Sequence, residues 1–517
     1  MEGSSHEDDR SRRLTDPERH DRPNRVVPGP TAWHGTRRGD LVGQDCAHRG
    51  SRGERRMSPA SLRIAALLAL SIPALLVWLA PVDAEAAPRR PNILIIVTDD
   101  QPRGTLSVMP TTRRLFVRGG RTYPNAYVTT PLCCPSRGSI LTGRYAHNHG
   151  ILTQEPQSFD VRTTIARHLR RAGYLTGIAG KYLNRWGTSP DFRPMSPPYF
   201  DLWATTRPDP DGYRKTLFNV NGRLRTIDRY STTFIGERTV AFLRTFDRRD
   251  DRPWLMYTGV IAPHSPYKAD AAYRNARVSP WPGNAAVFEE DRTDKPPYVQ
   301  AQNTSYARGR AVRARQLRTL MSVDDMVDAI FSEMARLGET RRTLAFFVSD
   351  NGLLWADHGI VNKTVPYLPS VRVPLLVRWP GRIPAGSVDE RLAANVDIAP
   401  TIARVARLAV DGPPMDGRPL FDRGWTRDHL LLEYFAGDTG IAPTWASLTA
   451  LTSQYVEYYD EDGNVTFREY YDLIQDPWQL TNALGDALPG NDPSPVELAD
   501  LSARLAAERE CAGAECP

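Results

Sequence analysis

The sequence PNILIIVTDD (residues 91–100) places five consecutive aliphatic side chains before Thr98 and a pair of carboxylates, Asp99 and Asp100. An aliphatic, β-branched run without polar alternation predicts a strand buried on both faces of a parallel sheet. Ligands gather at the carboxyl ends of such strands, so Asp99 and Asp100 are candidate site residues. A helix cap or a turn would explain two acids at this position equally well.

Strand and helix patterns alternate along the next 280 residues or so, which predicts a doubly wound α/β sheet. Helical periodicity covers 111–119, 162–172, 232–246 and 312–337, and strands are expected at 175–179, 254–260, 343–349 and 374–378. The segment from Trp186 to Thr232 is rich in Pro, Asp and Arg, and we expect long loops there.

The sequence pattern changes near Leu430. The stretches HLLLEYF, TWASLTAL, SQYVEYYD and VTFREYYDL are short candidate strands, and VELADLSARLAAERE is a candidate helix. We therefore expect a small α+β domain, an antiparallel sheet plus a helix, at 431–517 beside a main domain at 88–430.

The N-terminal segment carries an export signal rather than a fold. Residues 1–56 are rich in Arg, Asp, Gly and Pro without apolar period, which predicts disorder or a mis-assigned leader before a true start at Met57. Residues 57–87 combine Arg63, the apolar run 64–80 and small residues near Ala86, the pattern of a cleaved signal peptide. A membrane anchor and a twin-arginine signal at residues 55–56 are the alternatives. We expect a secreted or cell-envelope protein without stable membrane insertion.

The charge balance and the cysteine spacing argue against nucleic-acid binding and against a zinc site. The pI of 9.0 suggests a polyanion partner, but residues 88–517 hold 53 Lys and Arg against 48 Asp and Glu, too small a surplus for nucleic-acid binding. The five cysteines show no zinc-type spacing. Cys511 and Cys516 are candidates for a small disulfide loop, whereas adjacent Cys133 and Cys134 are too close for one.

The motif Cys133-Cys134-Pro135-Ser136-Arg137, followed by LTGR at 141–144, resembles the type I sulfatase signature. The resemblance extends from Pro91 to about Leu484. It implies an alkaline-phosphatase-like mixed sheet flanked by helices, and oxidation of Cys133 to formylglycine (3-oxoalanine) by a maturation enzyme. It also implies hydrolysis of a sulfate ester, in which one hydroxyl of the aldehyde hydrate attacks sulfur and the other expels sulfate.

The resemblance further assigns a calcium site and a set of cations. Asp350-Asn351-Gly352 follows the strand TLAFFVS, as the first acid pair follows its strand. By resemblance one Ca²⁺ is bound by Asp99, Asp100, Asp350 and Asn351 together with residue 133. Arg137 braces the nucleophile, Lys181 and Lys363 hold sulfate oxygens, and His264 is the acid for the leaving alcohol.

Motifs such as GKYLNRWG and VPLLVRWPG look closest to the N-acetylglucosamine-6-sulfatase-like branch, which implies a sulfated small molecule or glycan, such as a carbohydrate 6-O-sulfate. Two positions depart from the family. Leu183 stands where many members carry His, which makes neighbouring Asn184 a candidate for orienting the diol, and Leu354 replaces another His. His147, His149 and His358 are further candidates.

Two rival functions remain open at this stage. A phosphonate or phosphate monoester hydrolase could use the same scaffold, because sulfate and phosphate are both tetrahedral oxyanions. A catalytically silent secreted binding protein would keep the anion pocket with an unmodified Cys133.

Overall fold

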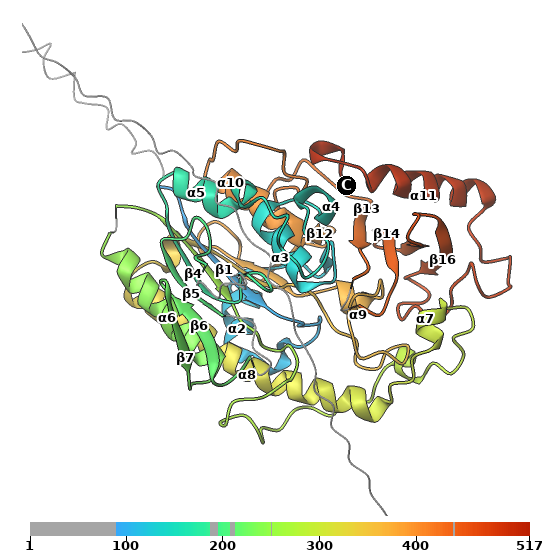
Figure 1. Cartoon of the computed structure of the whole chain (residues 1–517), viewed down its shortest axis with the longest axis horizontal. Coiled ribbons are helices and arrows are strands. Elements are labelled where there is room, and N and C mark those ends of the chain that lie inside the picture. The colour runs from blue at the N-terminus through green and yellow to red at the C-terminus, as the bar shows by residue number, and fades with distance from the viewer. Residues whose placement is uncertain (1–88, 187–194, 207–211, 250, 438–439) are drawn as a thin grey trace, which may run out of the picture. The chain divides into compact units, whose positions relative to one another are not determined.

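A ten-stranded mixed sheet forms the centre of the protein (Figure 1). The computed structural model describes residues 89–186, 195–206, 212–249, 251–437 and 440–517, so the predicted leader and signal peptide lie outside the described residues. The strand order is β11-β2-β10-β9-β1-β8-β4-β5-β6-β7. The strands are β1 (Asn92–Thr98), β2 (Arg121–Thr122), β4 (Leu175–Gly180), β5 (Leu202–Thr206), β6 (Thr216–Val220), β7 (Arg223–Ile227), β8 (Trp254–Gly259), β9 (Thr343–Ser349), β10 (Leu375–Arg378) and β11 (Ser387–Val388).

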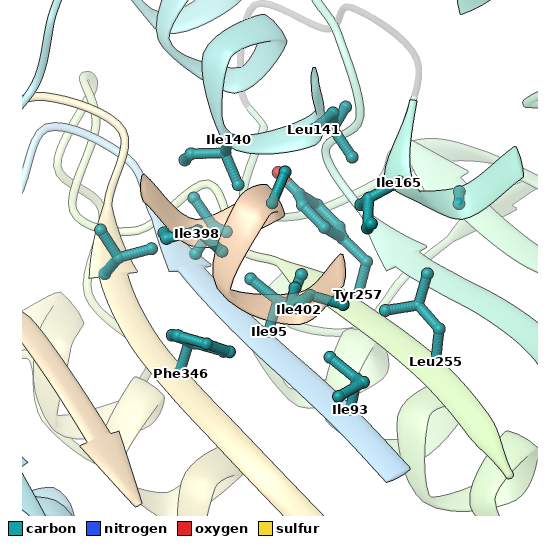
Figure 2. Packing of buried hydrophobic residues seen from close by; sticks show 14 of the residues in the cluster. Ile93, Ile95, Ile140, Leu141, Ile165, Leu255, Tyr257, Phe346, Ile398 and Ile402 are labelled. Atoms are coloured by element: carbon teal, nitrogen blue, oxygen red, sulfur yellow. The ribbon is translucent and has the colours of Figure 1, made fainter. Parts of the chain in front are cut away.

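Helices cover both faces of this sheet, which confirms the doubly wound α/β class (Figure 1). One face packs against α6 (Ser231–Asp247) and α8 (Tyr306–Arg336), the other against α3 (Cys133–Thr142), α5 (Ile165–Arg171) and α10 (Ile398–Val405). Because side chains alternate along a strand, Ile93 and Ile95 of β1 join one cluster and Leu94 joins the other. Figure 2 shows Ile95 of β1 beside Ile402 of α10. Full burial on both faces explains the unbroken aliphatic run of β1.

The structure contains the predicted helices and strands, and two of the helices differ in type or bounds. The pattern at 111–119 is the short helix α2 (Pro110–Thr112) followed by a π-helical turn, η2 (Arg113–Val117), and the long helix begins at Tyr306 rather than at residue 312. The remaining short elements are β3 (Ala126–Tyr127), paired with β12 (Ala393–Ala394), and the helices α4 (Ala146–His149), α7 (Pro297–Gln300), α9 (Leu368–Val371), η1 (Leu106–Val108), η3 (Val161–Thr163), η4 (Ala285–Phe288), η5 (Thr340–Arg342), η6 (Asn395–Asp397) and η7 (Gly513–Glu515).

The expectation of long loops between Trp186 and Thr232 was wrong for its described part. Strands β5, β6 and β7 extend the main sheet there, with β5 parallel to β4 and the next two antiparallel. The turn between β6 and β7 contains Asn221 and Gly222 with φ of 46° and 87°. Two positive φ values are what a two-residue hairpin turn requires, so Asn-Gly is a turn signal that outweighs the polar composition.

The C-terminal region forms the predicted antiparallel sheet plus helix. The sheet order is β13 (His429–Tyr434), β14 (Thr444–Ala450), β15 (Ser453–Tyr459) and β16 (Val465–Asp472), and α11 (Pro495–Glu508) packs against it through Leu505. Leu430 and Leu432 pack with residues of the main domain, whereas Leu431 faces the helix side. Cys511 and Cys516, which the sequence left as a candidate pair, form a disulfide. Among the described helices, none has the length and apolar character needed to cross a membrane.

Candidate active site

Two neighbouring parallel strands bring four polar residues to one point. β1 pairs in parallel with β9, so Asp99 and Asp100 lie beside Asp350 and Asn351 where the strands end. The backbone NH of Asp100 donates to Asp350 Oδ1 at 3.2 Å, and all four side chains are buried. The structure therefore brings together the four carboxylate and amide residues that the sequence predicted as one group.

Cys133 is the first residue of α3 and faces these carboxylates. Its Sγ lies 3.3 Å from Asp99 Oδ1 and accepts from Lys363 Nζ at 2.9 Å. Burial and the nearby charge of Asp99 raise the pKa of the Cys133 thiol to about 12. The unmodified thiol is thus protonated near neutral pH. A reactive cysteine, in contrast, would be a thiolate at that pH.

Three cations surround the carboxylates. Arg137, one turn along α3, donates from Nε to Asp350 Oδ2 and from Nη1 to the carbonyl of Lys181, both at 2.7 Å. Lys181 Nζ contacts Asp99 Oδ2, and Lys363 Nζ contacts Asp100 Oδ1. A Cβ on Gly259 would lie 2.3 Å from the Lys181 carbonyl, so glycine is required for this close approach.

Neighbouring charges shift the pKa values of the buried groups of the site. Burial alone would raise the pKa of Asp99, but Lys181, His264 and Arg137 together hold it well below its usual range. Nearby carboxylates outweigh burial for Lys363, whose pKa is raised well above its ordinary value. Burial and the neighbouring Asp99 raise the pKa of Asp350 above its ordinary value. Three carboxyl groups thus face three cationic side chains.

His264 lies at the mouth of the site. Its Nε2 is 3.7 Å from Asp100 Oδ2, and its side chain is 35% exposed while the carboxylate is 4% exposed. Its Nδ1 lies 2.7 Å from the Ser265 carbonyl, and because a carbonyl only accepts, Nδ1 carries a proton. Nε2 is left to face the site and to exchange a proton with an incoming group.

An unpaired oxygen indicates that this group of residues can hold a metal ion. The amide nitrogen of Asn351 donates to Asp100 Oδ1 at 2.7 Å and to the Gly352 carbonyl at 2.8 Å, but its buried Oδ1 has no hydrogen-bond partner in the described structure. Buried polar atoms are rarely left unpaired. Ligand atoms of Asp99, Asp100, Cys133 and His264 also lie within 4.8 Å of one another. A hard cation with oxygen ligands, such as Ca²⁺, suits these donors.

Four further candidates lie away from this centre. Asn184 donates to Gln154 Oε1 at 2.6 Å, and that oxygen accepts from the backbone NH of Cys134 at 3.3 Å. Asn184 therefore acts on the second residue of α3 rather than on Cys133 directly. His358 is buried, bonds Glu289 at 2.8 Å and lines a cleft of about 430 Å³.

The other two histidines support the structure around α3. His149 packs against Gly138, accepts from the Ile151 NH at Nδ1 and donates from Nε2 to the Pro135 carbonyl at 3.1 Å. Burial lowers its pKa to about 3, so it is neutral. His147 bonds Glu433 of β13 at 2.7 Å and lies at the junction with the C-terminal sheet.

Sequence reasoning missed two residues that hold the site in place. Gln316 of α8 is buried, and its amide donates to the carbonyls of Asp100 at 2.9 Å and Pro263 at 3.3 Å. Trp445 of β14 donates its indole NH to the carbonyl of Thr364, next to Lys363, at 2.9 Å. A lone glutamine on a helix and a tryptophan on a distant strand carry no local signal of these contacts.

Two known families match this chain. Residues 91–408 match the sulfatase family, and residues 356–493 match the family described as N-sulphoglucosamine sulphohydrolase, C-terminal. The chain is 30% identical to the N-acetylglucosamine-6-sulfatase of Homo sapiens over 83% of this chain and 86% of that one.

Solved structures share the fold. One, a complex with its substrate D-glucosamine-2-N,6-O-disulfate, superposes with a TM-score of 0.70 at 20% identity, over 81% of this chain and 97% of the other. The phosphonate monoester hydrolase of Agrobacterium radiobacter superposes with a TM-score of 0.64 at 21% identity, over 81% and 96%. At these identities the likeness concerns the fold alone.

Proposed function

The chain belongs to the sulfatase family and is a sulfuric ester hydrolase, and from this premise we propose that it hydrolyses a carbohydrate sulfate through formylglycine at residue 133 and one bound Ca²⁺. A carbohydrate 6-O-sulfate is the proposed substrate, in line with the N-acetylglucosamine-6-sulfatase that is 30% identical. The observation that carries the proposal is the position of Cys133 among Asp99, Lys181 and Lys363.

Residue 133 acts after a separate maturation enzyme, using an external two-electron oxidant, has replaced the Cβ–S bond with an aldehyde C=O, and the sulfur leaves as sulfide. The hydrated aldehyde supplies one hydroxyl to attack sulfur and a second whose collapse releases sulfate. The high pKa of the thiol supports this proposal, because a buried neutral thiol is a weak nucleophile. Since Cys133 is fully buried, oxidation must precede complete folding.

Asp99, Asp100, Asp350 and Asn351 are the proposed calcium ligands, together with residue 133. When bound there, the cation would polarise the attacking oxygen and offset the charge of the sulfate. The unpaired Oδ1 of Asn351 supports this assignment. Arg137 keeps Asp350 and the start of α3 in place through its two hydrogen bonds.

The remaining groups act on the sulfate and on the leaving alcohol. Lys181 and Lys363 are side chains whose raised pKa values keep them protonated, so they can hold sulfate oxygens. His264 is the partly exposed group at the mouth, where an alkoxide would depart, and its protonated ring can donate from Nε2. Asn184 orients the start of α3 indirectly, through its hydrogen bond to Gln154.

We further propose that the protein is exported. Residues 57–87 are the signal peptide, and the enzyme acts outside the cytoplasm or at the envelope. The disulfide between Cys511 and Cys516 supports an oxidising compartment.

The test compares turnover of an aryl sulfate with that of the matching aryl phosphate and phosphonate monoester. We expect the sulfate to be preferred, with activity lost in Cys133→Ala and on calcium chelation. A clear preference for the phosphorus ester would favour the phosphonate hydrolase reading. Binding of the sulfate without turnover would favour a silent binding protein.

A further inference from the structure

A strongly basic cleft opens beside the active site. It has a volume of about 450 Å³ and is formed by the segments around residues 213, 230, 266 and 274 and by α8. Five cationic side chains line it: Arg214, Lys268, Arg274, Arg315 and Arg318. Such a concentration of one charge favours the binding of an anion, because the cations attract it together.

Hydrogen bonds connect this cleft to the reaction centre. The hydroxyl of Tyr213, which lines the cleft, donates to the carbonyl of His264 at 2.6 Å. Arg315 is adjacent to Gln316, whose amide donates to the carbonyl of Asp100 at 2.9 Å. Tyr267 lines the cleft three residues after His264, so the loop that carries the proposed acid also forms a cleft wall. The cleft thus adjoins the mouth of the site at His264.

Two of the five cations of the cleft, Arg274 and Arg315, lack a protein partner among the described residues, whereas Arg214 and Arg318 have one. Arg214 lies 3.4 Å from Asp270, and Arg318 donates to the neutral carbonyl of Ala276 at 2.9 Å. Arg274 and Arg315 are exposed, and neither makes a hydrogen bond or ion pair with the part of the chain that the structure describes. Their guanidinium donors are free to bind a ligand.

We propose that this cleft is a subsite for a second anionic group, a sulfate or a carboxylate, on the glycan whose sulfate ester is hydrolysed. Guanidinium groups bind such oxyanions through paired N–H donors, and Arg274 and Arg315 supply them. The inference rests on the proposed function and narrows its substrate class to multiply charged sulfated saccharides. The second anion belongs either to the same sugar or to the next one along the chain.

The experiment compares kcat/KM for three substrates: a 6-O-sulfated hexosamine, the same sugar with a second sulfate, and a disaccharide that adds a uronate. We expect the wild type to prefer one of the doubly charged substrates, and added salt to reduce that preference by screening. The preferred one identifies the source of the second anion. Equal kcat/KM for all three would overturn the proposal.

Substitutions assign the preference to the cleft. In Arg274→Gln and Arg315→Gln, the ratio of kcat/KM for the preferred substrate to that for the monosulfate should fall by about threefold to tenfold each, mainly through KM. Arg277→Gln is the matched control, because Arg277 is exposed on the same segment but does not line the cleft. An unchanged ratio in the double variant, or an equal fall for Arg277→Gln, would contradict the assignment.

A binding readout keeps this test separate from catalysis. Titration calorimetry of the Cys133→Ala protein with a disulfated saccharide should give a weaker affinity once Arg274 and Arg315 are both replaced. Equal affinities would refute the subsite even if the enzyme is active. Absence of aryl sulfate turnover, in contrast, would refute the proposed function and leave the binding result standing.

Discussion

Replacing Arg137 with Met tests how the site is held together. Arg137 and Asp350 are both fully buried, and the Nε–Oδ2 bond of 2.7 Å is charge-assisted, worth about 1.5–3 kcal/mol. The bond from Nη1 to the Lys181 carbonyl adds about 1 kcal/mol. Removing one partner of a buried ion pair costs about 3–5 kcal/mol, and because Lys181 and Lys363 still face the carboxylates we expect about 3 kcal/mol.

The assay is denaturant unfolding with a calcium chelator present, so that metal binding does not contribute. Arg162→Met is the control, because the Arg162–Asp160 pair is exposed and its loss should leave the unfolding curve unchanged. Activity of Arg137→Met on an aryl sulfate should fall by at least about a hundredfold, as when a charge-stabilising group is lost. A loss of stability below about 1 kcal/mol would refute the idea that Arg137 holds Asp350.

Three further predictions concern the metal, a histidine and the disulfide. Excess Ca²⁺ should raise the thermal midpoint of the wild type but not of Asn351→Leu, and an equal rise would remove Asn351 from the ligand set. Burial lowers the pKa of His147, but its bond to Glu433 outweighs this and raises the pKa from 6.5 to about 8. Its stabilisation, about 2 kcal/mol, is therefore present below pH 6.5 and lost as the pH rises through 8. The stability difference between wild type and His147→Gln should accordingly shrink from pH 6 to pH 9, and a constant difference would contradict the pKa. Replacing Cys511 and Cys516 with Ser should reduce the free energy of unfolding by about 2 kcal/mol, and unchanged stability would show that the loop is already ordered without the bond.

The sequence predicted the part of the fold in which local pattern and burial agree. β1 and β9 are buried on both faces, so their residues must be aliphatic throughout, and the run is readable without a structure. Polar residues directly after two such strands predicted a shared site, because parallel strands end at the same edge. The motif at Cys133 then supplied the chemistry, which no periodicity contains.

The rest depends on tertiary contacts between distant segments. The basic cleft draws Tyr213 from the segment before β6, Lys268 from the loop after β8 and Arg315 from α8, and no local sequence pattern links these three segments. Gln316 and Trp445 act through backbone carbonyls, a role that their residue types do not announce. Strands β6 and β7 were readable from Asn221-Gly222, but the Pro- and Asp-rich surroundings favoured a loop.

Peptide mass spectrometry across residue 133, on protein from its native host, tests the central claim most directly. We predict a mass about 18 Da below that of the cysteine peptide, the change expected when a thiol is replaced by an aldehyde, in protein that hydrolyses an aryl sulfate. An unmodified Cys133 in folded, calcium-loaded and active protein would contradict the account.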